Sequence, residues 1–401
     1  MSPMSRDPVT ITGAGVVTPL GVGVSRFWER LLEGYDACTP TPRSVFGCPV
    51  PEYTFSLEGV GFDIEDHADY RLVRRMPRFS QISLVAAQEA MASCGLPEGA
   101  ERDEAGVVLG TAFSASEYHF EYFDGLFHEG LKEASPLLFS ESVMNGASGH
   151  ISHQLGLRGP GLTLLGSEDV GMHALATSLD QLRLGDVPCV LAGGADEYCD
   201  VHQTSLASYD VIGDAGARPF QRGSMAPPIG EGACFLILES LEHSNARGAK
   251  VLARVLGSSY GRRLPGDEPG AAVAQAIRGA LSDSDIAASD VDLVVSGAGG
   301  GTLDAVELAG LEAVFGSTQN LLITAPKRYF GEAFGLSSAA QVLVGALAIT
   351  HGNVPGSGDH RADMLPDAWR LPAKAESFAG DRALVVSATL EGGATAVVVG
   401  R

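Results

Sequence analysis

The sequence predicts an α/β fold of two similar halves, in which layers of helix, sheet, helix, sheet and helix are stacked. Short apolar runs alternate with stretches whose apolar residues recur at helical spacing, an order typical of mostly parallel sheets. The same order starts again near Val251. Of the 401 residues, 45% are hydrophobic, 19% are charged and 51 are glycine, so we expect a large core with many tight turns.

The first strand is predicted at residues 9–12, with the sequence Val-Thr-Ile-Thr. A glycine-rich turn, Gly13-Ala14-Gly15, follows it, and such a turn after a strand is one feature of dinucleotide-binding proteins. The pattern lacks a third glycine, and Pro19 stands where the phosphate-binding helix would begin. We therefore expect neither a dinucleotide site nor any other cofactor.

Two helices and a second strand come next. Residues 24–32 carry apolar side chains at helical spacing, and the Ala-rich residues 79–94 predict a helix that ends before Gly95. Residues 105–110 are apolar and predict a strand. This strand leads into an aromatic-rich segment at residues 113–127.

The remaining elements continue the alternation. In the first half we expect strands at residues 162–165, 187–192 and 235–238 and a helix at residues 170–184. In the second half we expect strands at residues 251–257, 291–296, 321–324, 383–387 and 395–399 and helices at residues 271–282, 304–315 and 337–350. The polar and charged residues 242–250 separate the halves, so the predicted domains are residues 1–245 and 246–401.

Charge and cysteine content narrow the classes of function. A net charge of −22 makes nucleic acid and anionic membranes poor partners. The N-terminus lacks an apolar signal core and no run of about 18 apolar residues exists, so we expect a cytoplasmic protein that spans no membrane. Six cysteines without metal-ligand spacing predict buried thiols in a reducing compartment and no metal site; they are Cys38, Cys48, Cys94, Cys189, Cys199 and Cys234.

Residues 159–171, Gly-Pro-Gly-Leu-Thr-Leu-Leu-Gly-Ser-Glu-Asp-Val-Gly, carry the first motif with chemical meaning. The segment resembles the nucleophile elbow of thiolase-fold ketosynthases, where a short strand leads to a cysteine that opens a helix. A helix N-terminus favours the thiolate form of such a cysteine. Counted from Gly159, the position of that cysteine falls on Glu168, and Gly171 matches the last glycine of the motif.

Two later segments resemble the histidine motifs of the same family. Ser296 stands at the position of the first histidine, with Asp304 and Glu307 at the acidic anchor that follows it. Lys327 matches the lysine of the second motif, and Glu332 replaces its histidine. The closing glycine-rich loop also departs from the family pattern, since it reads Leu-Glu-Gly-Gly at residues 390–393.

The resemblance spans about residues 8–400 and is closest in kind to the ketosynthase β subunit, or chain length factor, of type II polyketide synthases. Such subunits lack the catalytic cysteine, usually with Gln in its place, and pair with an active ketosynthase α subunit. Glu168 departs even from that Gln. The resemblance implies a thiolase-like fold, a heterodimer and a role in polyketide or antibiotic biosynthesis.

The replacements explain why this chain is not expected to condense acyl groups alone. Glu168 is a poor acyl carrier because an anhydride hydrolyses, and Ser296 keeps a hydroxyl donor but no imidazole. An ionised Glu332 would repel a developing oxyanion. Two buried carboxylates do not both ionise cheaply, so we expect one to pair with Lys327 or a backbone donor and the other to be neutral or hydrogen-bonded.

Four residues of the aromatic-rich segment are candidates for contact with an acyl chain. Ser116, His119, Phe120 and Phe123 fall on one helical face, and the resemblance places this segment on the tunnel that receives the growing polyketide. The alternative is that these side chains are simply core. A further resemblance, to a segment that contributes to subunit contacts in the family, covers Asn145 and His150-Ile151-Ser152.

Three functions remain open. The first is a non-catalytic chain length factor that shapes the tunnel of an active ketosynthase. The second is an enzyme, a malonyl-carrier decarboxylase or hydrolase that uses Glu168, and the third is a catalytically dead homodimer that binds acyl groups. Because acyl carrier proteins are acidic, we expect the carrier to bind mainly through the α subunit. The resemblance fits two kinds of pathway, because both aromatic polyketide and reduced polyene synthases use subunits of this kind.

Overall fold

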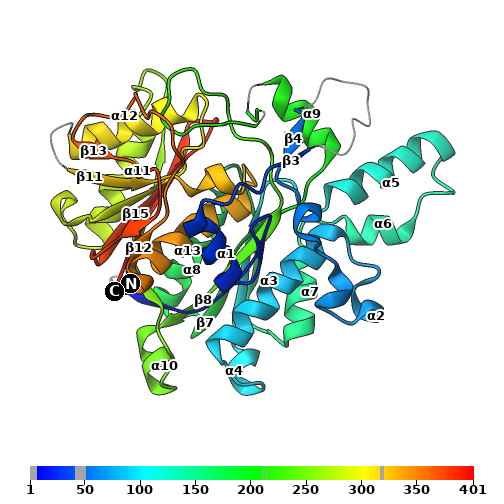
Figure 1. Ribbon diagram of the computed structural model, residues 1–401. Coiled ribbons are helices and arrows are strands. Elements are labelled where there is room, and N and C mark those ends of the chain that lie inside the picture. The colour runs from blue at the N-terminus through cyan, green and yellow to red at the C-terminus, as the bar shows by residue number, and fades with distance from the viewer. Residues whose placement is uncertain (1–6, 41–50, 210, 214, 317–319) are drawn as a thin grey trace.

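A computed structural model describes residues 7–40, 51–209, 211–213, 215–316 and 320–401 of the chain (Figure 1). One large mixed sheet runs through the molecule. Its strands, from one edge to the other, are β13 (Trp369–Arg370), β11 (Leu321–Thr324), β10 (Leu293–Ser296), β15 (Arg382–Ala388), β16 (Gly393–Gly400), β9 (Ala253–Arg262), β1 (Val9–Thr18), β8 (Gly232–Ser240), β7 (Cys189–Asp196), β5 (Gly106–Thr111) and β6 (Gly161–Leu165), with β2 (Gly21–Val22) beside β1.

Helices cover this sheet on its outer faces and fill the space between its two halves. They are α1 (Val24–Glu33), α2 (Tyr70–Val73), α3 (Arg78–Cys94), α4 (Ala100–Asp103), α5 (Ser116–Glu129), α6 (Pro136–Glu141), α7 (Gly146–Leu155), α8 (Val170–Leu184), α9 (Asp200–Ser208), α10 (Leu241–Ala246), α11 (Ala271–Asp283), α12 (Leu303–Phe315) and α13 (Gly335–His351). Shorter strand pairs are β3 (Thr39–Pro40) with β4 (Tyr53–Thr54), and β12 (Asn353–Val354) with β14 (Glu376–Ser377).

The five predicted layers are confirmed. Helices α8 and α13 pack against strands of both halves of the sheet and form the central layer. Helices α3 and α7 cover the outer face of the N-terminal half, whereas α11 and α12 cover that of the C-terminal half. Helix α13 is buried along almost its whole length, which explains its small and aliphatic side chains.

The prediction of mostly parallel sheets is wrong for the middle of the sheet. Strands β5, β6 and β7 are parallel, as are β10, β11 and β15, but β1, β8, β9 and β16 pair with their neighbours in antiparallel fashion. A short pairing between β1 and β9 joins the two halves into one continuous sheet. Alternation of strands and helices predicts parallel neighbours only where a helix connects two strands of one sheet.

The glycines after the first predicted strand do not form a turn. They lie within β1, which continues to Thr18. A Cβ atom at Gly15 would lie 2.0 Å from the carbonyl oxygen of Ala86, and one at Gly13 would lie 2.6 Å from that of Ala90. Both clashes are with α3, so these glycines allow the helix to pack closely on the strand.

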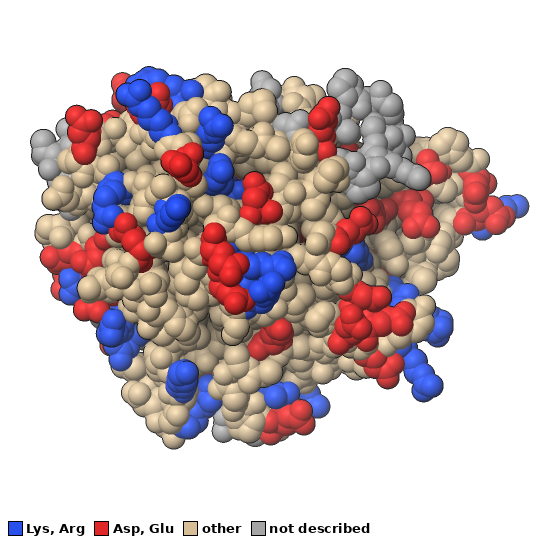
Figure 2. Space-filling view, in the orientation of Figure 1, with Lys and Arg blue, Asp and Glu red and all other residues tan. Residues whose placement is uncertain are grey.

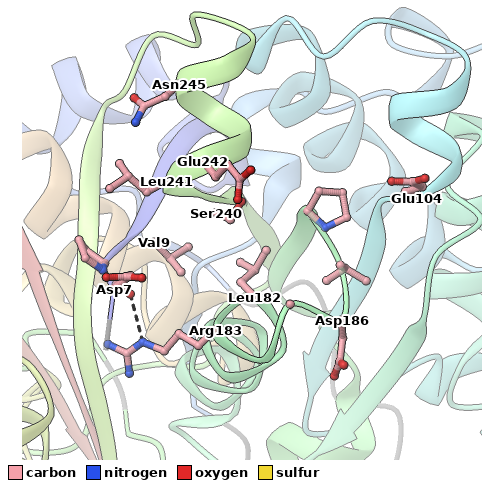
Figure 3. A pocket seen from close by; sticks show the side chains of 14 residues that line it. Asp7, Val9, Glu104, Leu182, Arg183, Asp186, Ser240, Leu241, Glu242 and Asn245 are labelled. Carbon is pink, nitrogen blue, oxygen red and sulfur yellow. Dashed lines mark hydrogen bonds between the residues drawn. The ribbon is translucent and has the colours of Figure 1, made fainter. Parts of the chain in front are cut away.

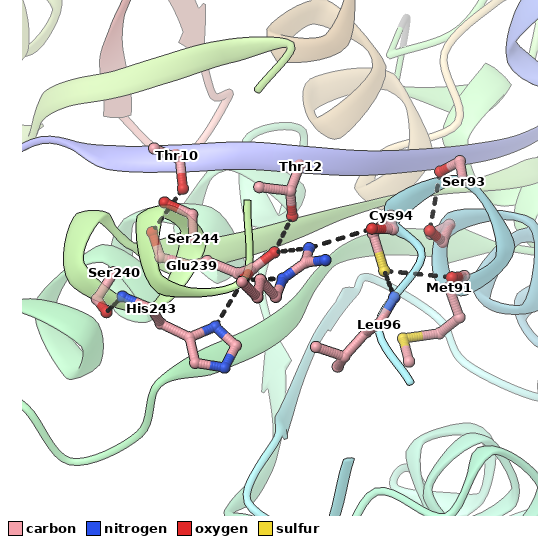
Figure 4. A network of polar contacts seen from close by, with 12 residues as sticks. Thr10, Thr12, Met91, Ser93, Cys94, Leu96, Glu239, Ser240, His243 and Ser244 are labelled. Carbon is pink, nitrogen blue, oxygen red and sulfur yellow. Dashed lines mark hydrogen bonds and ion pairs between the residues drawn. The ribbon is translucent and has the colours of Figure 1, made fainter. Parts of the chain in front are cut away.

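A buried carboxylate fixes the segment between the two halves (Figure 4). Glu239, at the end of β8, accepts hydrogen bonds from Arg247 Nε at 2.8 Å and from Thr12 Oγ1, and lies 2.6 Å from His243 Nδ1. Burial alone would raise the pKa of Glu239, but its bonds to Arg247, Thr12 and His243 hold it below the ordinary value. Arg247 also donates to the carbonyl oxygen of Cys94, which ties this segment to α3.

Four of the five described cysteines are buried, as predicted. Cys94, Cys189, Cys199 and Cys234 are buried free thiols and Cys38 is half-buried, while Cys48 lies outside the described residues. Within the described chain, no helix combines the length and apolar character needed to cross a bilayer.

Candidate functional site

Three of the four predicted active-site positions meet at one small cavity. Glu168 comes just before α8, and Lys327 and Glu332 lie in the segment between β11 and α13. All three line a cavity of about 20 Å³, which is room for roughly one water molecule. Gly171 helps to set this geometry, because its N–H donates to Ser338 Oγ of α13 at 2.9 Å.

Lys327 and Glu332 form a buried ion pair. Lys327 Nζ lies 2.5 Å from Glu332 Oε2, and the N–H of Phe334 donates to the other carboxylate oxygen at 2.9 Å. Burial alone would lower the pKa of Lys327, but the charge of Glu332 outweighs it and raises that pKa. This is the pairing of one carboxylate with Lys327 that the sequence predicted.

Glu168 is the second carboxylate of the cavity. Only 2% of its surface is exposed, and it accepts a hydrogen bond from Ser167 Oγ. Burial, and then the neighbouring charge of Glu332, raise the pKa of Glu168 to about 7. The carboxyl group is therefore partly protonated near neutral pH, in line with the expectation of one neutral or hydrogen-bonded carboxyl group.

Ser296 is not part of this cavity, which corrects the expectation that it keeps a hydroxyl donor there. The side chain is fully buried, and its hydroxyl group donates to Glu307 Oε1. Asp304 accepts from the N–H groups of Phe220 at 2.6 Å and Gly300 at 3.0 Å. Asp304 and Glu307 thus hold the backbone of the loop that follows Ser296. The glycines of this loop line the cavity, whereas Ser296 does not.

The four candidate chain-contact residues share a second cavity. Ser116, His119, Phe120 and Phe123 of α5 all line a space of about 370 Å³. The opposite wall comes from α9 and the residue before it, and includes His202. Sequence reasoning missed His202 because the polar residues 200–208 show no apolar helical periodicity.

A Ser–His contact lies inside this second cavity. His202 Nε2 lies 2.6 Å from Ser116 Oγ, and the hydroxyl group of Ser116 donates to the carbonyl oxygen of Phe113 at 2.7 Å. The rings of Phe113 and His202 stack with centroids 3.9 Å apart. Burial, and then the nearby His119, lower the pKa of His202 to about 4, so this imidazole is neutral at physiological pH.

Two aromatic rings in contact link residues of the two cavities. The ring of Phe113 lies edge-on to that of Phe334, with centroids 4.8 Å apart. Phe334 is bonded through its N–H to Glu332 of the first cavity, and its φ of 44° is unusual for a residue other than glycine. Phe113 lines the second cavity, so this ring contact connects that lining with Glu332 of the first cavity.

Large apolar side chains are exposed beside the second cavity. Helices α5 and α6 extend away from the body of the molecule, at the right of Figure 1. Their exposed residues, with the segment before α7, are Phe120, Phe123, Phe127, Leu131, Leu137, Phe139, Val143 and Met144. Leu162 and Leu165 of β6, the last strand of the sheet, are exposed as well. Several large exposed apolar side chains in one part of a molecule are typical of a protein–protein interface.

The segment expected at subunit contacts is only partly accessible. Asn145 is exposed at the start of α7, and His150 Nε2 lies 2.7 Å from Glu141 Oε2. Ile151, by contrast, is fully buried in the core of this chain and packs with α3. It is therefore unavailable to a partner.

A wider surface hollow of about 870 Å³ lies elsewhere, between the ends of α8 and α10 (Figure 3). Asp7, Glu104, Asp186 and Glu242 border it, and Arg183 donates to the carbonyl oxygen of Asp7 at 3.2 Å. None of the predicted site residues lines it. Acidic side chains also stand widely over the face shown in Figure 2, with basic ones among them, in accord with the net charge of −22.

The fold belongs to a known class. The chain matches "Beta-ketoacyl synthase, N-terminal domain" over residues 6–244 and "Beta-ketoacyl synthase, C-terminal domain" over residues 258–359. It is a member of the β-ketoacyl synthase family.

Two of the relatives that this chain resembles match it over most of their length. Nodulation protein E of Rhizobium leguminosarum bv. trifolii is 30% identical, over 88% of this chain and 89% of the relative. The 3-oxoacyl-(acyl-carrier-protein) synthase 2 of Rhizobium meliloti strain 1021 is 27% identical, over 90% of this chain and 92% of the relative.

Solved structures give the same fold. "The ishigamide ketosynthase/chain length factor" superposes with a TM-score of 0.89 at 25% identity and covers 99% of both chains. A β-ketoacyl synthase from Burkholderia phymatum STM815 gives a TM-score of 0.87 at 20% identity, over 98% of this chain and 99% of that one. At that identity the likeness concerns the fold alone.

Proposed function

We propose that this chain is the non-catalytic chain length factor of a ketosynthase pair that makes a polyketide. The observation that carries the proposal is the filled first cavity: Glu168 stands at the position that resembles the nucleophile, and the ion pair of Lys327 and Glu332 lies beside it. The likeness to the ishigamide ketosynthase/chain length factor supports the same function.

The first cavity lacks what a condensation needs. The reaction requires a thiolate to carry the acyl chain and hydrogen-bond donors aimed at the enolate of the extender unit. Here Glu168 offers a carboxyl group, the ammonium group of Lys327 is paired with Glu332, and the hydroxyl proton of Ser296 is donated to Glu307. Space for about one water also leaves no room for a thioester.

The exposed apolar surface gives the chain a way to act through a partner. The outer edge of β6 ends the sheet, and the large exposed side chains of α5 and α6 lie in the same half of the molecule. An exposed strand edge and a large apolar surface are liabilities for a single chain unless another subunit covers them. We assign them to the contact with an active ketosynthase α subunit.

The second cavity is then the part that shapes the product. Phe120 and Phe123 are 40% and 48% exposed, so the cavity lined by these residues opens toward the proposed partner contact. An acyl chain growing on the partner would enter it there. The acyl carrier protein would bind mainly to the α subunit, since the net charge of this chain is −22.

Co-expression with candidate ketosynthase α subunits tests the proposal. A complex of one copy of each chain should purify, and it should extend malonyl units on an acyl carrier protein where neither chain does so alone. A stable homodimer that binds acyl groups without a ketosynthase would favour the third function instead. Retention of full activity by the α subunit without this chain would rule the proposal out.

A second candidate function has one observation in its favour. The raised pKa of Glu168, about 7, suits a general acid or base at neutral pH, and Lys327 is close enough to affect it. Decarboxylation of a malonyl carrier, or hydrolysis, would use such a group. Carbon dioxide released from malonyl carrier by the isolated chain, and lost in Glu168→Gln, would establish this activity.

A further inference from the structure

Helices α5 and α6, with the segment before α7, form an arm of residues 116–144 that is both apolar and acidic. Besides its exposed apolar side chains, the arm carries six carboxylates and a single Lys or Arg. The carboxylates belong to Glu117, Glu121, Asp124, Glu129, Glu133 and Glu141, and the ammonium group to Lys132. At the right edge of Figure 2, acidic side chains stand out on this arm. A partner that covers the arm therefore meets negative charge.

The acidic side chains of α5 stand next to its aromatic rings. Phe120, Phe123 and Phe127 follow one another at helical spacing and are all exposed. Asp124 comes four residues after Phe120 and three before Phe127, and Glu121 comes three residues before Asp124. Residues three and four apart are neighbours on a helix surface. A surface that packs on these rings thus lies beside both carboxylates.

The chain itself compensates little of this charge. Asp124 Oδ1 lies 3.2 Å from His128 Nδ1, with the two side chains 55% and 76% exposed. Ion pairs so open to water contribute little. Glu117 is compensated in part by the nearby charge of Arg78. The remainder of the arm keeps a net negative charge.

The apolar face continues from the arm to the edge of the sheet. Helix α7 begins just after the exposed residues 143–144, and its Ser148 Oγ lies 2.9 Å from Thr163 Oγ1 of β6. Leu162 and Leu165 of β6 are 38% and 57% exposed, and this strand has no charged side chain. The arm and β6 together form one face, named here the docking face, with its negative charge on the arm.

A second copy of this chain fits the docking face poorly. A closed dimer with two-fold symmetry brings the same face of both copies together. The carboxylates of one arm would then oppose a face of the same sign, and exposed charges still repel within about 10 Å at 0.1 M salt. Lys and Arg on a different partner would instead attract these carboxylates while the apolar side chains are buried.

We propose that the docking face takes a partner chain whose facing surface is apolar with a basic border, and that its acidic arm disfavours a second copy of this chain. The inference rests on the proposed function only for the identity of that partner, the ketosynthase α subunit. It adds the chemistry by which this chain selects a different subunit over itself.

A charge-reversed variant of this chain supplies a partner of the required kind. Glu121→Lys with Asp124→Lys gives the arm a basic border and leaves its apolar side chains in place. Sedimentation and native mass spectrometry would compare the mixed pair with the pair of unmodified chains, at low ionic strength and pH 8, where an imidazole in water carries little charge. The mixed pair should be at least about tenfold tighter. Raising the salt to about 0.5 M should reduce the difference to less than about threefold.

Two results of this comparison would overturn the proposal. One is a pair of unmodified chains as tight as the mixed pair. The other is a mixed pair that does not form at all, which would show that an apolar surface with a basic border is not what the face takes.

A matched control separates the arm from the net charge of the chain. Glu242→Lys with Glu312→Lys makes the same change of net charge at exposed positions of α10 and α12, away from the arm (Figure 1). This variant should pair with the unmodified chain no more tightly than the unmodified chain pairs with itself. Mixed pairs as tight as those of the arm variant would show that net charge alone favours pairing, and the role given to the arm would be wrong.

A second matched pair of variants tests the apolar part of the face. Leu131, on the arm, is 78% exposed, and Leu264, in the C-terminal half, is 60% exposed. Leu131→Ser in both chains of the mixed pair should weaken it about fivefold, whereas Leu264→Ser should leave it unchanged. Circular dichroism checks that the variants are folded. A mixed pair indifferent to Leu131→Ser would place the contact outside the docking face and contradict the proposal.

These measurements need no ketosynthase, so the inference and the proposed function fail separately. Mixed pairs of the expected strength, together with no complex in any co-expression with a ketosynthase α subunit, would reject the proposed function and leave the charge selection standing. An active complex with an α subunit that tolerates Glu121→Lys with Asp124→Lys without loss of affinity would reject the charge selection alone. The expected result is a loss of about tenfold or more in the affinity of that complex.

Discussion

Lys327 Nζ lies 2.5 Å from Glu332 Oε2, and neither residue exposes more than 3% of its surface. The pair fills the position where the resemblance places a lysine and a catalytic histidine. Its charges compensate each other in the interior, so the site is stable without being able to stabilise an oxyanion. Disturbing either charge should therefore change stability more than any activity.

The first prediction concerns this ion pair. Lys327→Met leaves Glu332 buried without its partner and should lower the free energy of unfolding by about 3–5 kcal/mol. The double variant Lys327→Met, Glu332→Leu removes both charges and should regain much of that loss. Urea unfolding followed by circular dichroism measures both.

The matched control is an exposed pair on α1. Arg26 and Glu29 form a 2.7 Å ion pair with side chains 48% and 58% exposed. Arg26→Met should change stability by less than about 1 kcal/mol. If Lys327→Met were as mild as this control, the buried pair would not have the structural role given to it.

The second prediction is a pH dependence from Glu168. Its pKa is about 7 in the folded chain against an ordinary value of 4.5, so the folded state binds this proton more tightly than the unfolded state. The resulting stabilisation is complete below pH 4.5 and is lost as the pH rises through about 7. The loss is on the order of 3 kcal/mol.

Glu168→Gln keeps the shape of the side chain but removes the titration. The variant should gain stability relative to the unmodified chain as the pH rises from 5 to 8, measured by unfolding at both values. Other carboxyl groups with raised pKa, such as Asp196 and Glu307, occur in both proteins and cancel in the difference. Parallel pH profiles would show that Glu168 does not titrate in this range.

The third prediction concerns the helix contact beneath the site. A Cβ atom at Gly171 would lie 2.1 Å from the carbonyl oxygen of Gly335, where α8 meets α13. Gly171→Ala should therefore destabilise the chain by about 1–3 kcal/mol. Gly149→Ala, in α7 with open space around it, should be neutral or slightly stabilising, and thermal melts compare the two. Equal melting temperatures would contradict the close packing.

The fourth prediction concerns product length. Phe120→Ala enlarges the second cavity and should lengthen the products of the reconstituted ketosynthase pair by at least one extender unit. Phe127→Ala removes an 80% exposed ring that does not line the cavity and should leave the product distribution as it was. Mass spectrometry of the products measures their chain lengths. Unchanged lengths in Phe120→Ala would show that the second cavity does not set product length.

Most of the layer order could be predicted from sequence, because long apolar or Ala-rich segments such as α8 and α13 have a clear periodicity. The charge pairing at the first cavity could be predicted as well, since two carboxylates and Lys327 face the same space if the motifs superpose. The extent of β1 could not, because Gly13 and Gly15 are equally compatible with a turn. Only the packing of α3 shows why a strand needs them.

The direction in which a buried side chain points could not be predicted from the sequence either. Ser296 was expected to keep a donor at the site, but its hydroxyl group donates to Glu307 and its side chain does not line the cavity. His202 was missed because its helix is polar and far along the chain from α5. Tertiary contacts determine the orientation of Ser296 and the position of His202. Neither feature produces a local pattern in the sequence.

The most direct test is condensation by the purified chain alone. Supplied with acetyl and malonyl groups on an acyl carrier protein, it should form no carbon–carbon bond, while addition of the proposed ketosynthase α subunit should give chain extension. Formation of an acetoacetyl product by the chain without any other ketosynthase would contradict the account.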